Sequence, residues 1–456
     1  MARPRVEPPH PPMLSGLLPG RPSGHHFSSS LLDAAMSQPA ASPSEAVPTS
    51  PRTLTIYKVI ADGFPTYRAD VAVLFGKYLP VLGIRTHLVA QLAPGIEADK
   101  APGWPGGTLE LLPRYESRMR SHLAAFVGTT RSLLRLPKGR FDAIQIRDQV
   151  FVAIPGLFVA RRLGVPFFYW MSFPLSEAAQ RTAADLGLKV GLIRFLVLWT
   201  RGRLGAWLLY HVILPRSDFI FVQSDRMRED VARMGIDPAK MMPVPMGIDP
   251  ERFARAATVP VDRSRLAGRR VIAYLGTCDR MRRIDFLFEV LARVRARVPD
   301  AMLLIVGDAP EDEDKRWLRQ RAVDIGVADD VLITGWVAPE EGQAWLANAE
   351  VAVSIFAPDP LLDSCSPTKL VEYLAMGKAV VANDQPDQSV VVNESQAGLC
   401  VPFEVEPFAA AVERLLADPR EASRMAARGP DYVRRQRSYP ILAEQVAAAY
   451  RRWIGS

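Results

Sequence analysis

Short apolar runs alternate along this chain with longer segments whose apolar residues recur at helical spacing. This alternation predicts parallel strands covered by helices. The expected helices include 69–82, 151–163, 285–298, 315–325, 339–347 and 367–376. The expected strands are 53–60, 84–91, 141–146, 165–170 and 219–223, then 271–275, 302–306, 331–334, 351–356 and 379–382. Two such series predict an α/β protein with two doubly wound, Rossmann-like domains facing each other across a cleft, which is the default ligand site.

Changes in this pattern suggest the domain limits. Residues 1–50 are rich in Pro, Ser, Ala and Gly and lack an apolar period, so we expect a disordered tail, with Met36 as a candidate start. We expect a first domain at 51–248 and a second at 249–436. A C-terminal helix at 437–456 is expected to cross back to the first domain.

Composition and charge narrow the class of protein. The 456 residues are 48% hydrophobic and 23% charged, and no apolar run is long enough for a membrane-spanning helix. Three widely spaced cysteines indicate neither a disulfide framework nor a zinc site, and they fit a reducing compartment. Residues 51–250 carry 26 basic and 16 acidic side chains, whereas 251–456 carry 27 and 30. The first half therefore has either an anionic partner (membrane surface, lipid phosphate or nucleic acid) or a merely solvated basic surface.

The most informative segment is 363–382. Ser366 is expected to cap a short helix that ends at Gly377, between two buried strands. Unpaired N–H groups at a helix start favour an anion such as phosphate. Lys369 in the first turn opposes the helix dipole, which a bound anion would reverse, and Glu372 lies one turn on, within reach of a sugar hydroxyl. A solvent-facing lysine and glutamate are the plain alternative.

Further strand ends of the second half are expected at the same sheet edge. Gly276 and three arginines at 280–283, among them Arg282, follow one strand. Because arginine binds phosphate bidentately, two such loops would clamp a diphosphate, although one or two arginines fit a plain surface role. Gly307 and Val337 follow the next strands, where their backbone would line a nucleobase pocket or simply form turns.

The first half gives weaker signals. Arg147 and Asp148 end an expected strand, as acceptor-binding groups or as a structural salt bridge. Residues 186–214 mix tryptophan, leucine and arginine, as in segments that lie on anionic membranes or in buried helices. The whole chain shows no nucleophile–base pair, metal-ligand spacing, P-loop or complete Gly-x-Gly-x-x-Gly.

These motifs together resemble a known family. Residues 366–381 resemble the donor-site signature of the family 4 glycosyltransferases, which have the GT-B fold. The resemblance extends to the family's phosphate-binding turn, two strand ends and interdomain segment, at 276–287, 306–308, 334–337 and 245–253.

The resemblance implies retaining transfer from a UDP- or GDP-sugar, without a metal or cofactor. It implies that the diphosphate binds Gly276, Arg282, Thr368 and Lys369, and the nucleoside Gly307, Val337 and Glu372. The family often has a second Glu eight positions before the residue matching Glu372. Ser364 stands there, beside Asp363, so these two residues and Glu372 are the catalytic candidates. A His that many members carry in the first domain has no counterpart in 167–174.

We therefore expect a hexosyltransferase of polysaccharide or glycolipid assembly, acting on a glycan or lipid-phosphate acceptor and not on nucleic acid. It would be cytoplasmic and peripheral on the inner face of the cytoplasmic membrane. A non-catalytic scaffold of the same fold and a sugar-nucleotide epimerase are the alternatives. The sequence leaves open the donor sugar, its base, the acceptor, the linkage and the oligomeric state.

Overall fold

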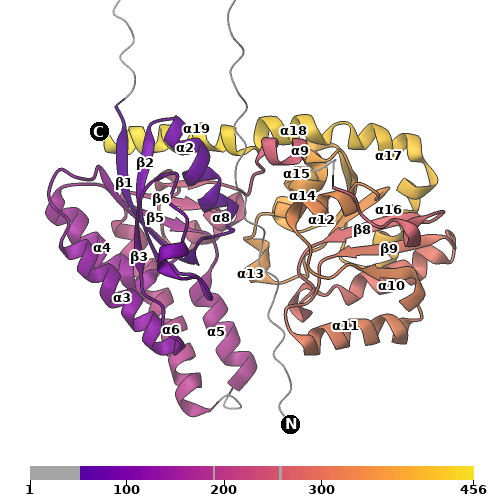
Figure 1. Cartoon of the computed structure of the whole chain (residues 1–456), viewed down its shortest axis with the longest axis horizontal. Coiled ribbons are helices and arrows are strands. Elements are labelled where there is room, and N and C mark those ends of the chain that lie inside the picture. Colours follow the sequence, from indigo (N-terminus) through magenta and orange to yellow (C-terminus); the bar gives the residue numbers. More distant parts are fainter. Residues whose placement is uncertain (1–51, 188–190, 256–258, 456) are drawn as a thin grey trace, which may run out of the picture. The chain divides into compact units, whose positions relative to one another are not determined.

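Two parallel β-sheets organise the residues that the computed structural model describes, namely 52–187, 191–255 and 259–455 (Figure 1). Their strand orders are β3-β2-β1-β4-β5-β6-β7 and β10-β9-β8-β11-β12-β13. Each sheet winds outward from its first strand in both directions, so the predicted doubly wound α/β class is confirmed. The tail expected at 1–50, with Met36, lies outside the described residues. The strands are β1 (Leu54–Phe64), β2 (Ile84–Leu92), β3 (Gly107–Leu112), β4 (Ala143–Arg147), β5 (Phe167–Met171), β6 (Phe219–Val222), β7 (Met241–Pro243), β8 (Arg270–Leu275), β9 (Ala301–Val306), β10 (Val331–Ile333), β11 (Val351–Ser354), β12 (Ala379–Asn383) and β13 (Gly398–Val401).

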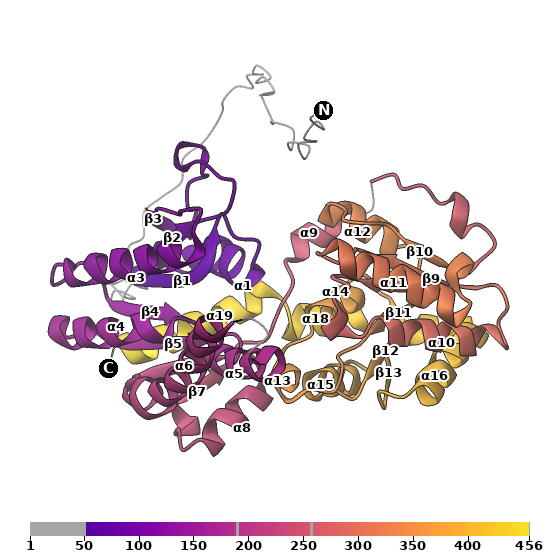
Figure 2. The same ribbon diagram turned by 90° about the horizontal axis from the view of Figure 1, so that it is seen from below.

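Helices cover both faces of each sheet (Figure 2). Those of the first half are α1 (Ala69–Ala72), α2 (Leu79–Val81), α3 (Arg118–Leu134), α4 (Val150–Leu163), α5 (Leu175–Leu186), α6 (Leu192–Leu208), α7 (Leu214–Arg216) and α8 (Asp225–Arg233). Those of the second half are α9 (Pro250–Arg255), α10 (Asp285–Arg295), α11 (Asp312–Ile325), α12 (Pro339–Leu346), α13 (Pro360–Asp363), α14 (Thr368–Ala375), α15 (Pro386–Ser395), α16 (Val405–Ala417), α17 (Pro419–Ala426), α18 (Gly429–Gln436) and α19 (Tyr439–Ile454). None of the described helices is long and apolar enough to cross a membrane.

The core is divided between the two faces of each sheet, because successive strand residues point to opposite sides. In β1, Ile56 packs in the same apolar cluster as the C-terminal helix α19, whereas Val59 packs in the cluster of α3 and α4. Helix α19 joins its cluster through Leu442, Val446 and Tyr450. The last helix of the chain thus packs against the first sheet.

Each sheet changes its winding direction beside its first strand, between β1 and β4 and between β8 and β11. In open parallel sheets, ligands bind outside the carboxyl ends of the strands at such switch points. The two places to search are therefore the ends of β1 and β4 and the ends of β8 and β11.

Candidate functional site

Three segments meet closely at the carboxyl edge of the second sheet. Gly276 follows β8 with a φ of 143°, and Gly307 follows β9 with a φ of 139°. A Cβ atom on Gly307 would lie 2.2 Å from the carbonyl oxygen of Gly276, and one on Gly276 would lie 2.0 Å from Cε of Lys369. The backbone angle favours glycine at both positions, and at Gly307 the close approach to the backbone of Gly276 does so as well. The first turn of α14 therefore contacts the turn after β8.

The Lys369 side chain is held in this contact without a polar partner. Its Nζ lies 5.3 Å from the centroid of the Tyr274 ring, and it makes no hydrogen bond or ion pair to any residue that the structure describes. Burial, followed by the nearby charge of Arg282, lowers the pKa of Lys369 to about 7. A bound anion would favour the charged ammonium.

Glu372 lies one turn further along α14 and is also unpartnered among the described residues. Burial raises the pKa of its carboxyl to about 7, against the opposing charges of Arg252 and Lys369. A partly buried carboxylate without a hydrogen-bond donor is costly, so this group is suited to accept a hydrogen bond from a ligand.

A hollow of about 150 Å³ brings several of these groups together. Its lining includes Gly276, Gly307, Val337 and Glu372, which come from four separate segments of the second half. These are the residues expected at the nucleoside and at the phosphate-binding turn.

Two further residues line the same hollow and were not predicted from the sequence motifs. Arg252 and Gln343 line it, and the Oε1 atom of Gln343 is buried with no hydrogen-bond partner in the part of the chain that the structure describes. Gln343 lies on the buried face of α12, so its polarity in an apolar pattern was the available signal.

The three arginines after β8 have different surroundings. Arg280 pairs with Glu313 and Asp314, and Arg283 pairs with Asp285. The Nε atom of Arg282 lies 3.1 Å from Asp279, and its charge is close enough to lower the pKa of Lys369. Arg282 is therefore the arginine of this turn that lies near Lys369.

The start of α14 differs from the expectation in one respect. The helix begins at Thr368, and Ser366 does not cap it. The Oγ atom of Ser366 instead accepts a hydrogen bond from the backbone N–H of Met246 at 2.9 Å. The predicted cap was wrong because the serine oxygen holds the segment that connects the two sheets.

The candidates Asp363 and Ser364 lie shortly before α14, at the last residue of α13 and the residue that follows it. The Ser364 hydroxyl donates to Asp230 of α8 at 3.0 Å, while its carbonyl accepts from the Ser224 hydroxyl at 2.7 Å. Burial raises the pKa of Asp363, with nearby carboxylates adding to the shift. The structure thus engages Ser364 in contacts to the first half and leaves Asp363 as the acid of this segment.

One side chain that sequence reasoning missed fixes this segment before α14. The Nε2 atom of Gln385 donates to the carbonyl oxygens of residues 362, 363 and 365, at 2.9–3.1 Å. Its place just after β12 carried no recognisable motif, since its partners are backbone atoms about 20 residues earlier in the chain.

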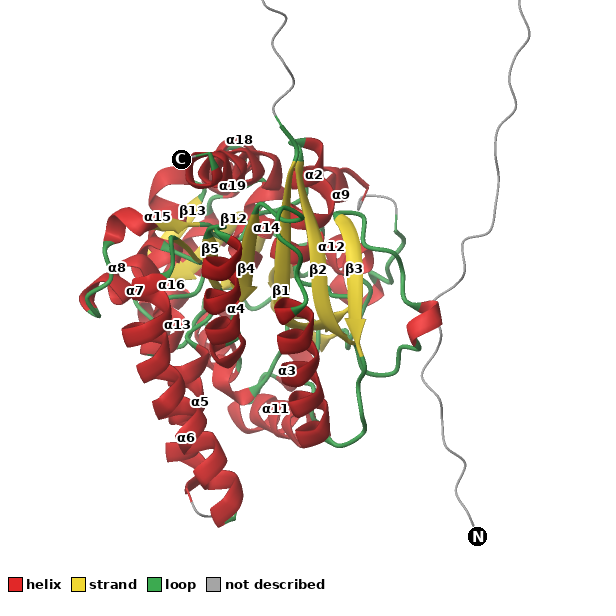
Figure 3. Cartoon of the chain, turned by 90° about the vertical axis from the view of Figure 1, so that its left-hand side faces the viewer, coloured by secondary structure: helices red, strands yellow, loops and turns green. Residues whose placement is uncertain are grey.

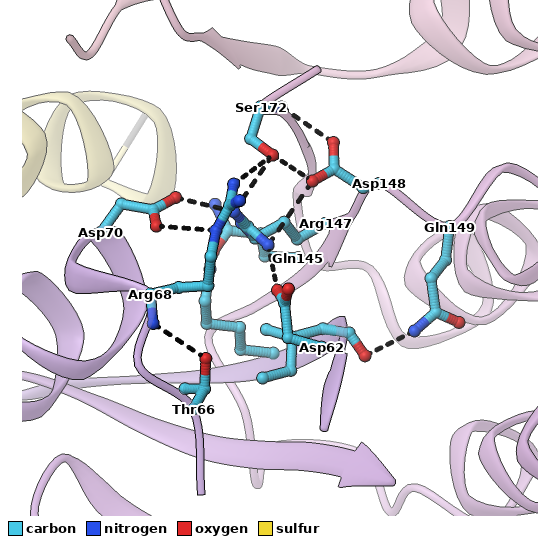
Figure 4. Close-up of polar contacts among 11 residues, drawn as sticks. Asp62, Thr66, Arg68, Asp70, Gln145, Arg147, Asp148, Gln149 and Ser172 are labelled. Carbon is cyan, nitrogen blue, oxygen red and sulfur yellow. Dashed lines mark hydrogen bonds and ion pairs between the residues drawn. The ribbon is translucent and has the colours of Figure 1, made fainter. Parts of the chain in front are cut away.

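A buried charge network occupies the switch point of the first sheet (Figure 4). Arg147, at the end of β4, is 1% exposed and pairs with Asp62, Asp70 and Asp148. Its guanidinium also donates to the Ser172 hydroxyl at 3.0 Å. Figure 4 shows the three carboxylates and the hydroxyl around Arg147, with the guanidinium of Arg68 as a second cation beside Asp70 and Ser172.

The members of this network differ in how far their side chains are exposed to solvent. Arg147 and Asp148 are almost completely enclosed, whereas the Asp62 side chain is 28% exposed. Asp148 has a left-handed φ of 56°, and burial raises its pKa. Asp62 is therefore the carboxylate that a ligand on this side would meet, held in place by Arg147.

Known proteins share both halves of this architecture. The family model described as "Glycosyl transferase 4-like domain" matches residues 72–247, and "Glycosyl transferases group 1" matches residues 269–418. A GDP-mannose-dependent alpha-(1-6)-phosphatidylinositol monomannoside mannosyltransferase of Mycobacterium tuberculosis is 32% identical over 237 residues, which are 51% of this chain. The chain covers 61% of the length of that relative.

Solved structures agree on the fold. Sucrose-phosphate synthase of Thermosynechococcus elongatus aligns with a TM-score of 0.67 over 88% of this chain and 99% of its own, at 18% identity. HepE of Anabaena, solved in complex with UDP-glucose, aligns with a TM-score of 0.62 over 87% of this chain and 99% of its own, at 15% identity. With one family model matching most of each half, the chain belongs to the group 1, or family 4, glycosyltransferases, and it has the GT-B fold.

Proposed function

We propose that this chain transfers a hexosyl unit, with retention of configuration, from a UDP- or GDP-sugar to a glycan or lipid-linked acceptor. One observation carries the proposal. An ammonium and a carboxylate that have no hydrogen-bond or ion-pair partner among the described residues, those of Lys369 and Glu372, lie one turn apart on α14, beside the turns that follow β8 and β9. That pair matches the two polar parts of a nucleoside diphosphate, its phosphates and its ribose hydroxyls.

The proposed roles follow from position. The Lys369 ammonium and the Arg282 guanidinium would hold the diphosphate beside Thr368 at the start of α14, and Glu372 would accept from the ribose. The N–H of Thr368 already donates to the carbonyl oxygen of Ser366 at 3.1 Å, so a phosphate would have to compete for it. As the bond between the sugar and the diphosphate breaks, the negative charge on the leaving diphosphate grows. Cations already in place stabilise that charge without reorganisation, which is where most of the rate enhancement would arise.

The relatives support the donor class. One is named as GDP-mannose-dependent and another was solved with UDP-glucose, so both bases are candidates here. Asp363 and Ser364 remain candidates for contacts with the donor sugar. Asp62 joins Arg147 and Asp148 as the acceptor-side candidate, because it is the exposed member of their network.

The function is tested by incubating the protein with radiolabelled UDP- and GDP-sugars and a membrane fraction. Transfer of label to a lipid or glycan is expected. A non-catalytic scaffold is the second candidate, since the Ser364 hydroxyl is engaged with Asp230. Donor binding with neither sugar transfer nor slow donor hydrolysis would support that candidate. Conversion of the donor in the absence of an acceptor would indicate an epimerase.

The low pKa of Lys369 gives a pH test of the diphosphate site. Above pH 7 a nucleoside diphosphate keeps its charge, while Lys369 loses its proton. Between about pH 7.5 and 9, nucleoside-diphosphate affinity is therefore expected to fall about tenfold, whereas the affinity for the free nucleoside stays level. Calorimetric titration at several pH values measures both. The Lys369→Met variant should bind weakly at every pH, and an unchanged pH profile in that variant would contradict the role of Lys369.

A further inference from the structure

The helical hairpin of α5 and α6 has one packed face and one open face. Gly202 and Gly205 of α6 lie against α5 so closely that added Cβ atoms would meet Gln180 at 2.5 Å and Ser176 at 3.0 Å. The two glycines lie three residues apart, on one side of α6. Figure 3 shows the two helices side by side over most of their length. The packing of α6 against α5 therefore uses small residues, and its larger side chains point elsewhere.

The open face of α6 is apolar. Ile193 is 76% exposed and Trp207 is 54% exposed, and Leu192, Leu196, Val197 and Leu204 are exposed with them. The stripe also carries the exposed Arg203, whose guanidinium lies 5.4 Å from the Trp199 ring. A face this wide and apolar is unusual on a helix whose other side is already buried.

Exposed apolar side chains continue on the two neighbouring helices. Phe158 on α4 and Met119 and Leu123 on α3 are each more than 60% exposed. In Figure 3, α3, α4 and α6 lie next to one another on one face of the first sheet. Fourteen of the 24 exposed large apolar side chains in the described residues belong to these three helices. They are concentrated there, unlike the single exposed residues common on soluble proteins.

The charge of this surface has one sign. Helices α3, α4 and α6 contain three, two and three arginines, and none of them contains an aspartate or glutamate. Part of the basic excess in the first half therefore belongs to the helices that form this apolar surface. A face that combines exposed apolar and aromatic residues with arginine alone is complementary to an anionic lipid bilayer.

We propose that the exposed face of α3, α4 and α6, centred on α6, docks this chain on an anionic bilayer. Apolar side chains such as Ile193, Val197 and Trp207 enter the boundary between headgroups and acyl chains. Exposed arginines such as Arg201 and Arg203 meet lipid phosphates. A second copy of the chain is a poorer occupant, because a two-fold contact would place arginine-only surfaces against each other.

The proposed docking surface borders a cavity. A cavity of about 700 Å³ lies between the hairpin and α13, lined by Trp199 and Arg203 of α6 and by Leu361 of α13. Since α13 ends at Asp363, next to Ser364, a lipid-borne acceptor entering here would approach the donor site. This step, unlike the docking itself, rests on the proposed function.

Sedimentation of the full chain with vesicles tests the docking. Binding to vesicles of phosphatidylcholine with 30% phosphatidylglycerol is expected, with weaker binding to pure phosphatidylcholine and at high salt. The double variant Ile193→Asp/Val197→Asp should reduce binding about tenfold or more, and Arg201→Glu about fivefold. Val323→Asp and Arg316→Glu, on exposed positions of α11 in the second half, are the matched controls and should bind like the wild type.

Three results would overturn the docking proposal: equal binding to neutral and anionic vesicles, α6 variants that bind like their α11 controls, or a concentration-dependent dimer that the double variant abolishes. Nucleotide binding by the same samples reports on folding and on the donor site. A variant that loses vesicle binding but keeps nucleotide affinity supports the docking alone. A protein that docks but binds no nucleotide would count against the proposed function alone.

Discussion

Replacing Glu372 with alanine is expected to weaken nucleoside-diphosphate binding by about 10–100-fold. The carboxylate would accept a hydrogen bond from the ribose, and a hydrogen bond to a charged group contributes about 1.5–3 kcal/mol. Among the described residues it has no other partner, so its removal leaves no protein group unsatisfied. The thermal midpoint should therefore stay level or rise, because a partly buried carboxyl has been removed. Calorimetric titration and thermal melts measure the two effects.

A thermodynamic cycle that combines the Glu372→Ala variant with a nucleotide lacking the ribose hydroxyls shows whether this loss of affinity arises at the ribose. The wild type should bind the 2′,3′-dideoxy form more weakly than the ribonucleotide, whereas Glu372→Ala should bind both alike. Glu444→Ala, on an exposed position of α19, is the control for loss of a carboxylate elsewhere. A variant that binds within twofold of the wild type, or that still prefers the ribonucleotide, would refute the role of Glu372.

The fold was largely predictable because its strands are buried on both faces. Runs such as 302–306 and 379–382 are continuously apolar, and each is a central strand of its sheet. The strands that the pattern missed were β3, β7 and β13, which are short or lie at sheet edges. β7 has only three residues and ends at Pro243, so its sequence carried no strand signal.

The candidate site was predictable where backbone chemistry fixes the residue type. Gly276 and Gly307 have positive φ, and Lys369 opposes the polarity of the helix whose first turn contains it. Contacts between segments that are far apart in the sequence leave no such signal in the residue types. The hydrogen bonds of Gln385 to the segment before α14 and of Ser366 to Met246 join residues 20 and 120 positions apart, so only the folded chain reveals them.

The charge network of the first sheet combines both situations. Arg147 and Asp148 drew attention because they end a strand, but Asp62 and Asp70 lie about 80 residues earlier and were not connected to them. The network places three carboxylates around one buried guanidinium, so its energetics depend on Arg147 more than on any single acid. That dependence can be measured.

Replacing Arg147 with methionine is expected to destabilise the protein by about 3–5 kcal/mol at pH 7, since it removes the buried cation that pairs with Asp70 and Asp148. Burial raises the pKa of Asp70, and the charges of Arg147 and Arg68 more than offset that effect, so its pKa lies below the ordinary value. The stabilisation from Asp70 is therefore present above its unfolded pKa and is lost as the pH falls. The difference between wild type and variant should accordingly shrink as the pH falls below about 4.

Urea midpoints across this pH range, with nucleotide binding to report on the second half, measure the effect. Adding Asp70→Asn to Arg147→Met should recover part of the loss, because one buried charge is removed with its partner. Arg316→Met, on an exposed position of α11, should stay within about 0.5 kcal/mol of the wild type. A loss below about 1 kcal/mol in Arg147→Met, or one that does not change with pH, would mean that water or another cation neutralises these carboxylates. Arg147 would then not be the group that holds Asp62 in place for an acceptor.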